Sequence, residues 1–369
     1  MSMLEIDKVS KVYKTGTFGG DVQLALRGVS FNIDQGEVVS LIGQSGSGKS
    51  TLGKILLRLV RPSGGTIRFN GRDIMSWGKR ELRDYYRQVQ GVFQDPFSSY
   101  NPLYKADRVF EMVRGVYFDH LSTSEWEAKL EDALEAVSLN PADVMNKFPH
   151  QLSGGQQQRL LIARALLLEV KLLIADEIIS MLDASTRVDV LNLLVDLKKK
   201  GLGVLFITHD LSLGNYISDR TVILRYGATV EMGDTHKVFG NPQHPYTKSL
   251  LTAVPQLHKK WGSAGAQVTA GPLAADAGAG GQTGAATMVA VSAEDDADPR
   301  RYSKSPLHPM HRAKADKAER PRLSLMDQPD QPWARRFRMG GPDYAAVIAA
   351  NPPPPMLEVE PQHFVAQAT

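Results

Sequence analysis

Residues 43–50 decide the fold, and they read Gly43-Gln44-Ser45-Gly46-Ser47-Gly48-Lys49-Ser50. The pattern is G-x-x-x-x-G-K-[ST], a glycine-rich loop whose backbone N–H groups cradle phosphate oxygens. An apolar run at residues 37–42 predicts a buried strand before the loop, and residues 51–59 predict a helix after it. The N-terminus of that helix would point its positive end at the same anion. Strand, loop and helix in this order predict a site for a nucleoside triphosphate.

The end of this loop carries the predicted chemistry. Lys49 would reach the outer phosphates as a mobile cation, and the Ser50 hydroxyl is a predicted Mg²⁺ ligand. We therefore expect ATP and Mg²⁺ to bind along the loop from Gly43 to Thr51.

Composition limits the class of protein. The chain has 369 residues, enough for one large domain and a smaller one, and it has no cysteine, which excludes disulfides and thiolate-held metals or clusters. Its net charge of +3 does not argue for nucleic acid. Charged residues interrupt the most apolar stretch, residues 160–179, whereas a membrane span needs about 20 predominantly apolar residues. We expect no signal peptide, and we expect any membrane role to come through a partner.

The rest of the first 240 residues predicts an α/β fold. Apolar or alternating runs predict strands at residues 3–7, 29–33, 65–69, 172–175 and 204–207. The last two are short and continuously apolar, as in a parallel sheet covered on both faces, and helix-period segments separate them. Residues 96–165 are largely helical and form an insertion in this core.

Composition changes sharply after Trp261. Residues 262–286 are nearly all Gly, Ala, Ser, Thr and Gln, which predicts a flexible linker or an insertion. Residues 300–369 are rich in proline and are basic around residues 312–338, which favours a solvated tail over an interaction arm. Within that region, residues 357–360 indicate one strand.

Two carboxylates end the apolar strand at residues 172–175. Asp176 can hold Mg²⁺ through water, and Glu177 can accept a proton from an attacking water. Adjacent strand residues point to opposite faces, so the two groups need not crowd one point. Taken alone, such a pair is more often an ordinary surface feature.

A second predicted anion site lies at Leu152-Ser153-Gly154-Gly155-Gln156. These residues supply a hydroxyl and unobstructed backbone N–H groups at the start of a strong helix. Because the chain has one phosphate loop, we expect this site to cover a nucleotide held by another subunit. Here the chain resembles the ATP-binding cassette (ABC) family, whose signature motif is this sequence, and the resemblance covers about residues 3–255.

The resemblance implies a phosphate-loop ATPase with a RecA-like core, an N-terminal antiparallel β subdomain and a helical insertion. In that family two cassettes dimerise head to tail with ATP between them. Tyr13 falls where the family stacks an aromatic ring on adenine. Gln94 matches the glutamine that contacts Mg²⁺ and the attacking water. His209 matches the histidine that contacts the γ-phosphate, and Asp183 lies in the loop that communicates across the dimer.

The resemblance thus implies catalytic roles for Glu177, His209 and Gln94, and Mg²⁺ contacts for Ser50, Gln94 and Asp176. The residues expected to bind the nucleotide are Tyr13, Gly43, Gln44, Ser45, Gly46, Ser47, Gly48, Lys49, Ser50, Thr51, Gln94, Ser153, Gly154, Gly155, Gln156, Asp176, Asp183 and His209.

One residue departs from the family pattern. The family usually has proline after the catalytic glutamate, and this chain has Ile178. Isoleucine leaves the backbone N–H free and adds a β-branched side chain. Because Glu177 and Asp183 are retained, we expect catalysis to be kept with an adjusted geometry.

Residues 241–251 resemble the His-Pro-Tyr-Thr extension of oligopeptide and dipeptide importers, and residues 93–102 resemble their F-type ATPase subunit. Taken without the family, the extension would read as a turn. The implied organisation is an ATPase domain at 1–240, an extension at 241–261, a linker at 262–299 and a basic region at 300–369. The implied activity is ATP hydrolysis coupled to uptake of oligopeptides or dipeptides.

The implied partners are a second cassette, identical or homologous, two polytopic permeases and an extracytoplasmic solute-binding protein, with no direct contact to nucleic acid. The subunit would lie at the cytoplasmic face of the inner membrane and dock through residues 97–110. Three alternatives stay open: import of oligosaccharides or other solutes, a soluble cassette protein acting on nucleic acid or ribosomes, and a subunit that binds ATP without hydrolysing it.

Overall fold

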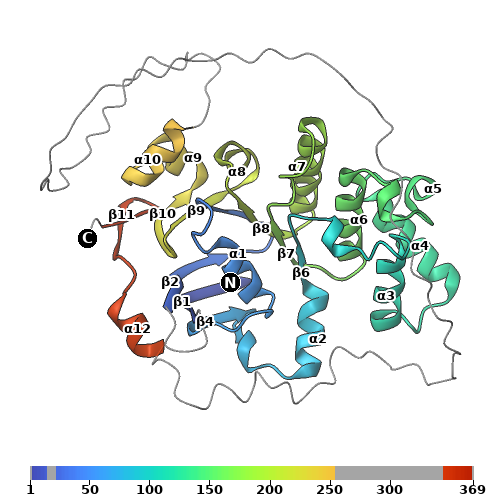
Figure 1. The fold of residues 1–369 in the computed structure, drawn as a ribbon, viewed down its shortest axis with the longest axis horizontal. Coiled ribbons are helices and arrows are strands. Elements are labelled where there is room, and N and C mark those ends of the chain that lie inside the picture. Colours follow the sequence, from blue (N-terminus) through green and yellow to red (C-terminus); the bar gives the residue numbers. More distant parts are fainter. Residues whose placement is uncertain (1, 15–21, 254–343, 368–369) are drawn as a thin grey trace, which may run out of the picture. The chain divides into compact units, whose positions relative to one another are not determined.

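The computed structural model describes residues 2–14, 22–253 and 344–367, and its ribbon is drawn in Figure 1. The N-terminal strands form an antiparallel sheet in the order β2-β1-β4-β5. Its strands are β1 (Leu4–Lys14), β2 (Val22–Ile33), β4 (Gly64–Phe69) and β5 (Arg72–Asp73). This sheet confirms the predicted antiparallel β subdomain.

A second sheet holds the phosphate loop and has the order β11-β12-β10-β9-β3-β8-β7-β6. Its strands are β3 (Val38–Ile42), β6 (Val89–Val92), β7 (Leu172–Asp176), β8 (Gly203–Thr208), β9 (Arg220–Arg225), β10 (Ala228–Asp234), β11 (Met356–Glu360) and β12 (His363–Ala366). The five strands from β9 to β6 are parallel. Their carboxyl ends therefore meet at one edge of the sheet, where ligands bind in such folds.

Helices cover this sheet, and the predicted α/β fold is confirmed. The described helices are α1 (Lys49–Leu56), α2 (Lys79–Gln88), α3 (Arg108–Tyr117), α4 (Thr123–Glu135), α5 (Pro141–Val144), α6 (Gly154–Leu166), α7 (Ala184–Lys199), α8 (Leu211–Ile217), α9 (Thr235–Gly240), α10 (Pro245–Thr252) and α12 (Tyr344–Ala350). Helices α3 to α6 gather beyond β6 in Figure 1 and form the predicted helical insertion. No helix in the described ranges is long and apolar enough to span a membrane.

Two cores lie on the two faces of the parallel strands. Alternate residues of β8 show the division: Leu205 packs with α1 and the N-terminal sheet, whereas Phe206 packs with α6 and α7. Residues Ile174 and Leu173 of β7 divide in the same way. Burial on both faces explains why these strands are continuously apolar.

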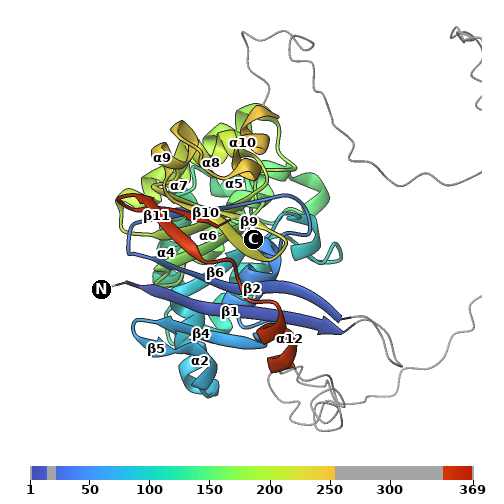
Figure 2. The same ribbon diagram turned by 90° about the vertical axis from the view of Figure 1, so that its left-hand side faces the viewer.

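The C-terminal residues return to the same sheet. The strand predicted at residues 357–360 is confirmed as β11, and it forms a hairpin with β12. Strand β12, which the sequence did not predict, pairs antiparallel with β10. Figure 2 shows the red C-terminal segment running from α12 beside β1 to β11. The predicted linker at 262–286 and the basic stretch at 312–338 lie outside the described residues.

Candidate functional site

A cavity of about 810 Å³ opens at the carboxyl ends of the parallel strands. Its wall brings together the phosphate loop with Tyr13, Gln94, Glu177 and His209. These residues come from five segments that the sequence places far apart. The topology unites four of them because β3, β6, β7 and β8 end at the same edge, and Tyr13 comes from β1 of the N-terminal sheet.

The phosphate loop needs glycine at two of its positions. Gly48 has a φ of +101°, and a Cβ there would lie 2.4 Å from the Ala25 carbonyl oxygen. At Gly43 a Cβ would lie 2.2 Å from the Leu224 carbonyl oxygen. Any side chain would therefore push the loop away from β2 and β9.

Lys49 lies under this loop as a buried cation, with 5% of its surface exposed. Its Nζ donates to the carbonyl oxygens of Gly43, at 2.7 Å, and Gln44, at 3.1 Å. Burial lowers the pKa of Lys49, while the nearby carboxylates of Glu177 and Asp176 raise it. The ammonium group is therefore close to the loop, and two carboxylates favour its charge.

Ser50 lies in the cavity wall, and Asp176, at the end of β7, is buried beside Ser50 and is not itself one of the wall residues. The Ser50 hydroxyl donates to Asp176 Oδ1 at 3.3 Å. Burial raises the pKa of Asp176 above its usual value, and the Ser50 hydrogen bond opposes that rise. A hydroxyl beside a carboxylate, with the Gln94 amide in the same cavity wall, is a donor set that suits Mg²⁺.

Glu177 and His209 face each other across the ends of β7 and β8. Glu177 Oε1 lies 3.2 Å from His209 Nδ1, with 19% and 60% of the side chains exposed. The Glu177 backbone has a φ of 51°, in the left-handed region. A half-buried carboxylate paired with an exposed imidazole can take a proton from water in the cavity.

Ile178, the departure from the family pattern, is buried in the core between the sheet, α6 and α7. A proline at this position would disfavour the α region for the residue before it. Isoleucine places no such restriction on Glu177, whose left-handed conformation is therefore compatible with this chain's sequence.

The residues after Gln94 connect the cavity to the signature helix. Gln94 is exposed and follows β6. The Tyr100 hydroxyl donates to the Gln157 carbonyl oxygen at 2.9 Å, in the first turns of α6. The Gln157 amide in turn donates to the carbonyl oxygens of Pro149 and Leu152. The segment after Gln94 is thus tied to α6 by a buried hydrogen bond.

The signature residues lie outside this cavity wall. Ser153 begins α6 as its N-cap: its hydroxyl accepts from the Gln156 N–H at 3.2 Å, and Gln156 Oε1 accepts from the Ser153 N–H at 2.9 Å. Gly154 and Gly155 are the first helical residues, where N–H groups have no partner within the helix. The start of α6 therefore offers N–H groups to an anion at a place outside the wall of the chain's own cavity.

Asp183 also serves as a helix cap rather than as a wall of the cavity. Its carboxylate accepts from the Ser185 hydroxyl at 2.6 Å and from the Thr186 N–H at 3.0 Å, which starts α7. These hydrogen bonds hold the pKa of Asp183 well below its usual range. A Cβ at Gly155 would lie 2.4 Å from Thr186, so this cap lies against the signature helix.

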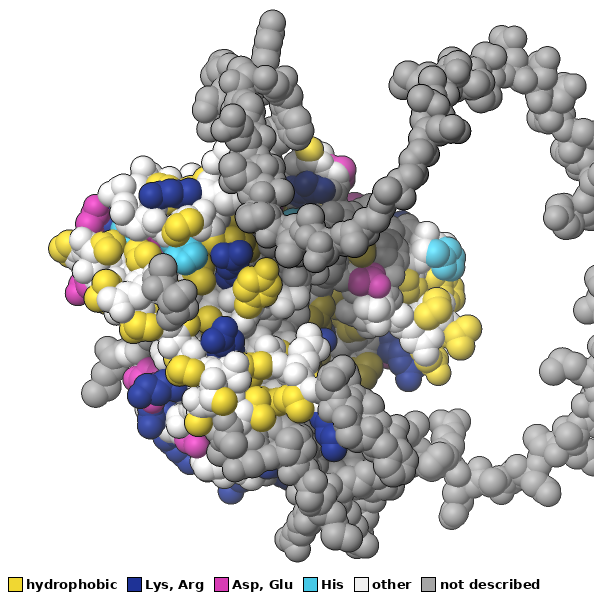
Figure 3. Space-filling view, turned by 60° about the vertical axis from the view of Figure 1, so that its left-hand side comes forward, with side chains coloured by type: hydrophobic (Ala, Val, Ile, Leu, Met, Phe, Trp, Pro, Cys, Tyr) yellow, Lys and Arg dark blue, Asp and Glu magenta, His cyan; other side chains and the backbone are white. Residues whose placement is uncertain are grey.

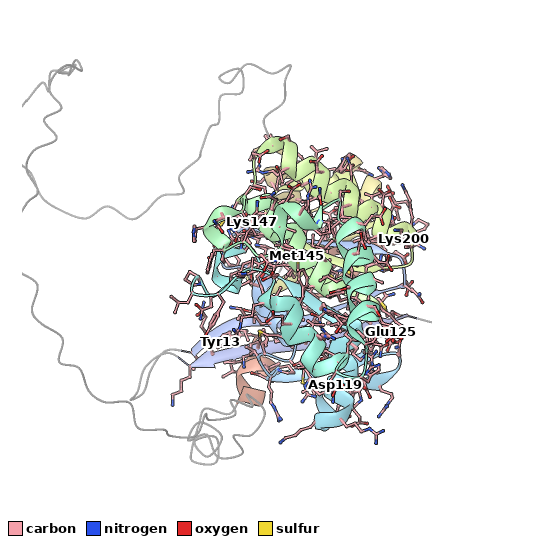
Figure 4. The ribbon with its side chains drawn as sticks, turned by 90° about the vertical axis from the view of Figure 1, so that its right-hand side faces the viewer. Tyr13, Asp119, Glu125, Met145, Lys147 and Lys200 are labelled. Atoms are coloured by element: carbon pink, nitrogen blue, oxygen red, sulfur yellow. The ribbon has the colours of Figure 1, made fainter. Side chains whose placement is uncertain are left out.

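Tyr13 lies near the end of β1, as Figure 4 shows, and is paired there with Gln23 of β2. The Lys11 ammonium lies 4.9 Å from the centre of its ring. The cavity wall also contains Gln23, Ala25 and Leu250, which sequence reasoning missed. The alternation of Gln23 and Ala25 along β2 was the available signal, but Leu250 comes from the separate helix α10.

Comparison with known proteins gives two family matches. Residues 26–180 match the family described as ABC transporter. Residues 230–281 match the family described as oligopeptide/dipeptide transporter, C-terminal region. The second match begins in β10 and includes α10.

Individual proteins agree with these matches. The oligopeptide transport ATP-binding protein OppF of Streptococcus mutans is 41% identical over 255 residues, which are 69% of this chain and 82% of that protein. AppF of Bacillus subtilis, an oligopeptide transport ATP-binding protein, is 40% identical over 70% of this chain and 80% of its own length. A dimeric structure of the ATP-binding cassette MJ0796 bound to ADP and Pi matches with a TM-score of 0.57 and 31% identity, covering 63% of this chain and 99% of that one.

Proposed function

Because this chain belongs to the ABC transporter family, we propose that it is the ATP-hydrolysing subunit of an importer of oligopeptides or dipeptides. The ATPase activity coupled to transport follows from the family. The peptide substrate is supported by the match of residues 230–281 to the oligopeptide/dipeptide transporter C-terminal region, and by the names of OppF and AppF. Import of oligosaccharides or other solutes remains the alternative.

In the proposed reaction ATP lies in the cavity above β3. The backbone N–H groups of the loop and the α1 N-terminus would hold the phosphates. The Lys49 ammonium would turn from the loop carbonyl oxygens towards the outer phosphates of the bound ATP. Tyr13 would stack on the adenine. The oxygen donors of Ser50, Asp176 and Gln94 would hold Mg²⁺, which supplies charge neutralisation at the phosphates.

Glu177 would act as the general base for the attacking water. Its carboxylate lies in the cavity wall and within 3.2 Å of His209, which would contact the γ-phosphate. Gln94, which also lies in the cavity wall, would orient the water. This assignment needs only one proton transfer, from water to the Glu177 carboxylate, as the γ-phosphate is attacked.

A second cassette would complete the site. Ser153 and the first N–H groups of α6 lie outside the chain's own cavity wall, so another cassette's signature helix would cover the nucleotide. A dimeric arrangement is supported by the solved structure of MJ0796, which is a dimer bound to ADP and Pi. The second cassette would be either a copy of this chain or a homologue.

The remaining partners would be two permease subunits and an extracytoplasmic solute-binding protein, which would place this chain at the cytoplasmic face of the inner membrane. The exposed side chains of Leu103, Tyr104 and Met112 in the helical insertion offer an apolar docking surface. On the described surface that Figure 3 shows, Lys and Arg side chains lie in separate groups among hydrophobic ones. The basic side chains on this face do not join into the continuous stripe that nucleic-acid binding uses.

The test is ATP-driven uptake of a labelled oligopeptide by proteoliposomes that contain the complete transporter. The proposal predicts that uptake requires ATP on the side of the membrane that the ATPase subunits face. Replacing the subunit with its Lys49→Ala variant should abolish uptake. A complex that hydrolyses ATP but takes up a labelled oligosaccharide in place of every peptide tested would contradict the substrate. Failure of the chain to associate with any permease would contradict the importer role itself.

A further inference from the structure

Helix α10 reaches the phosphate loop from outside the cavity. Tyr246, in the first turn of α10, is buried, and its hydroxyl accepts a hydrogen bond from the Gln44 N–H at 3.1 Å. Leu250, one turn later on the same face of the helix, lies in the cavity wall. The extension after the ATPase domain is therefore part of the nucleotide site.

The hydrogen bond to Tyr246 falls on the peptide group that joins Gly43 to Gln44 at the start of the loop. Lys49 donates to the carbonyl oxygens of Gly43 and Gln44, so the Gln44 residue is held at its N–H by Tyr246 and at its carbonyl by Lys49. When Lys49 turns to phosphate, the Tyr246 hydrogen bond is the one of these two that remains. Tyr246 can thus keep the start of the loop in place while the lysine changes partner.

Tyr246 is itself firmly held. The Arg225 guanidinium lies 4.9 Å from the centre of its ring. The Tyr246 N–H donates to His244 Nδ1 at 3.1 Å, which caps the helix. The loop before the helix is tied to β10 because the Glu231 carboxylate accepts from the N–H groups of Gln243, at 2.8 Å, and His244, at 3.0 Å.

The Glu231 carboxylate has a third partner from the far end of the chain. His363 Nε2 of β12 lies 2.7 Å from Glu231 Oε1, and both side chains are completely buried. A buried carboxylate is costly unless several donors satisfy it, and loss of one partner leaves its buried charge less compensated. Strand β12 therefore holds the Glu231 carboxylate in place, and that carboxylate in turn holds the loop before Tyr246.

We propose that Tyr246 is a positioning residue for ATP binding, holding the phosphate loop at Gln44, and that His363 supports it through Glu231. The inference rests on the proposed function, since it concerns the same nucleotide site. It assigns a role to the extension and to the C-terminal strand in setting the shape of the loop before ATP arrives.

The test measures KM for ATP and kcat for phosphate release in the complete transporter, using the full chain. Tyr246→Phe keeps the ring against Arg225 and removes only the hydroxyl. We expect KM to rise by about three- to tenfold, the worth of one hydrogen bond. We expect kcat to stay within about twofold, because the loss concerns binding of the substrate and transition state alike.

The matched control is Tyr226→Phe. The Arg225 guanidinium also lies 5.1 Å from the centre of the Tyr226 ring, but 72% of the surface of Tyr226 is exposed. Its loss of a hydroxyl should leave both constants unchanged. An unchanged KM in Tyr246→Phe, or an equal rise in Tyr226→Phe, would overturn the proposal. A wild-type complex that neither binds nor hydrolyses ATP would instead overturn the proposed function.

The link to the C-terminal strand is tested by His363. His363→Leu removes the donor to Glu231 and should raise KM, whereas His363→Gln can place an amide N–H near the Nε2 position and should restore it. In the Tyr246→Phe background the His363→Leu change should add little, since both act through one contact. A full additional rise there would show that His363 acts by another route. If His363→Leu fails to fold, the comparison of wild type with Tyr246→Phe still decides the role of Tyr246.

Discussion

Glu177 illustrates how a single residue is held for chemistry. Its left-handed backbone, with a φ of 51°, is uncommon outside glycine and costs on the order of 1–3 kcal/mol. The surrounding structure fixes it: the Glu177 N–H donates to the Ile207 carbonyl oxygen at 2.9 Å. Its own carbonyl oxygen accepts from both the N–H and the hydroxyl of Ser180. The turn therefore directs the carboxylate into the cavity.

Lys49 gives the first prediction at this scale. Lys49→Ala removes the buried cation under the phosphate loop. We expect the Kd for ATP to rise by about 10- to 100-fold, as for loss of a charged hydrogen bond. Lys54→Ala, on an exposed position of the same helix α1, is the control and should bind ATP like wild type. Fluorescence titration with a nucleotide analogue measures both. Equal affinities for the Lys49 variant and wild type would refute this role.

At the scale of elements, two helix caps of the same kind have different proposed roles. Ser153 caps the signature helix α6, and Ser122 caps α4 with the same capping box. Removing either hydroxyl should cost the helix about 1 kcal/mol. Because only α6 is proposed to face the partner's nucleotide, the two losses should differ in their effect on turnover.

We therefore expect Ser153→Ala to lose most ATP turnover in the assembled complex, while Ser122→Ala keeps it. As isolated chains, both variants should bind ATP like wild type, because neither residue lies in the chain's own cavity wall. Melting temperatures show whether the two cap losses are comparable. Equal turnover in the two variants would remove Ser153 from the site.

Helix α10 should respond to pH through its cap. Burial lowers the pKa of His244 below its usual value of 6.5, with the Arg225 charge acting in the same direction and Glu231 opposing it. The unprotonated Nδ1 accepts the Tyr246 N–H. The folded helix thus binds a proton less readily than the unfolded chain, so its stability is full above about pH 6.5 and falls as the pH drops below that value.

Hydrogen exchange at the N–H groups of residues 245–252, corrected for intrinsic rates, measures this effect. The opening free energy should fall as the pH is lowered below about 6.5. His244→Asn is the control, because asparagine keeps a cap acceptor that does not titrate in this range. A wild-type profile as flat as that of the control would contradict the account.

At the scale of the whole molecule, local patterns predicted the phosphate loop and several strands of both sheets, because burial periodicity and glycine spacing are local signals, but they did not predict β6, β9 or β10. They also predicted β11. They did not predict that β12 would pair with β10, because nothing near His363 indicates a partner 132 residues away at Glu231. The contact of Tyr246 with Gln44 was missed for the same reason, since the tyrosine alone reads as part of a turn.

The C-terminal strands give a prediction about the intact chain. A protease site inserted in the predicted linker, residues 262–286, should be cut without loss of ATP hydrolysis. The released C-terminal piece should stay bound, because β12 pairs with β10 and His363 is buried against Glu231. Size-exclusion chromatography of the cut protein measures this retention. Separation of the C-terminal piece would contradict the pairing of β12 with β10. Loss of ATPase activity on cutting would contradict the prediction that residues 262–286 are a linker.

The central claim is that this cavity hydrolyses ATP with Glu177 as the base. The most direct measurement is phosphate release by the complete transporter, compared between wild type and Glu177→Gln, with bound ATP assayed in the same samples. The account predicts steady release by wild type and a loss of about 10²–10⁴-fold in the variant, which should still hold ATP. Release by Glu177→Gln at the wild-type rate, or a wild-type complex that binds ATP without releasing phosphate, would contradict it.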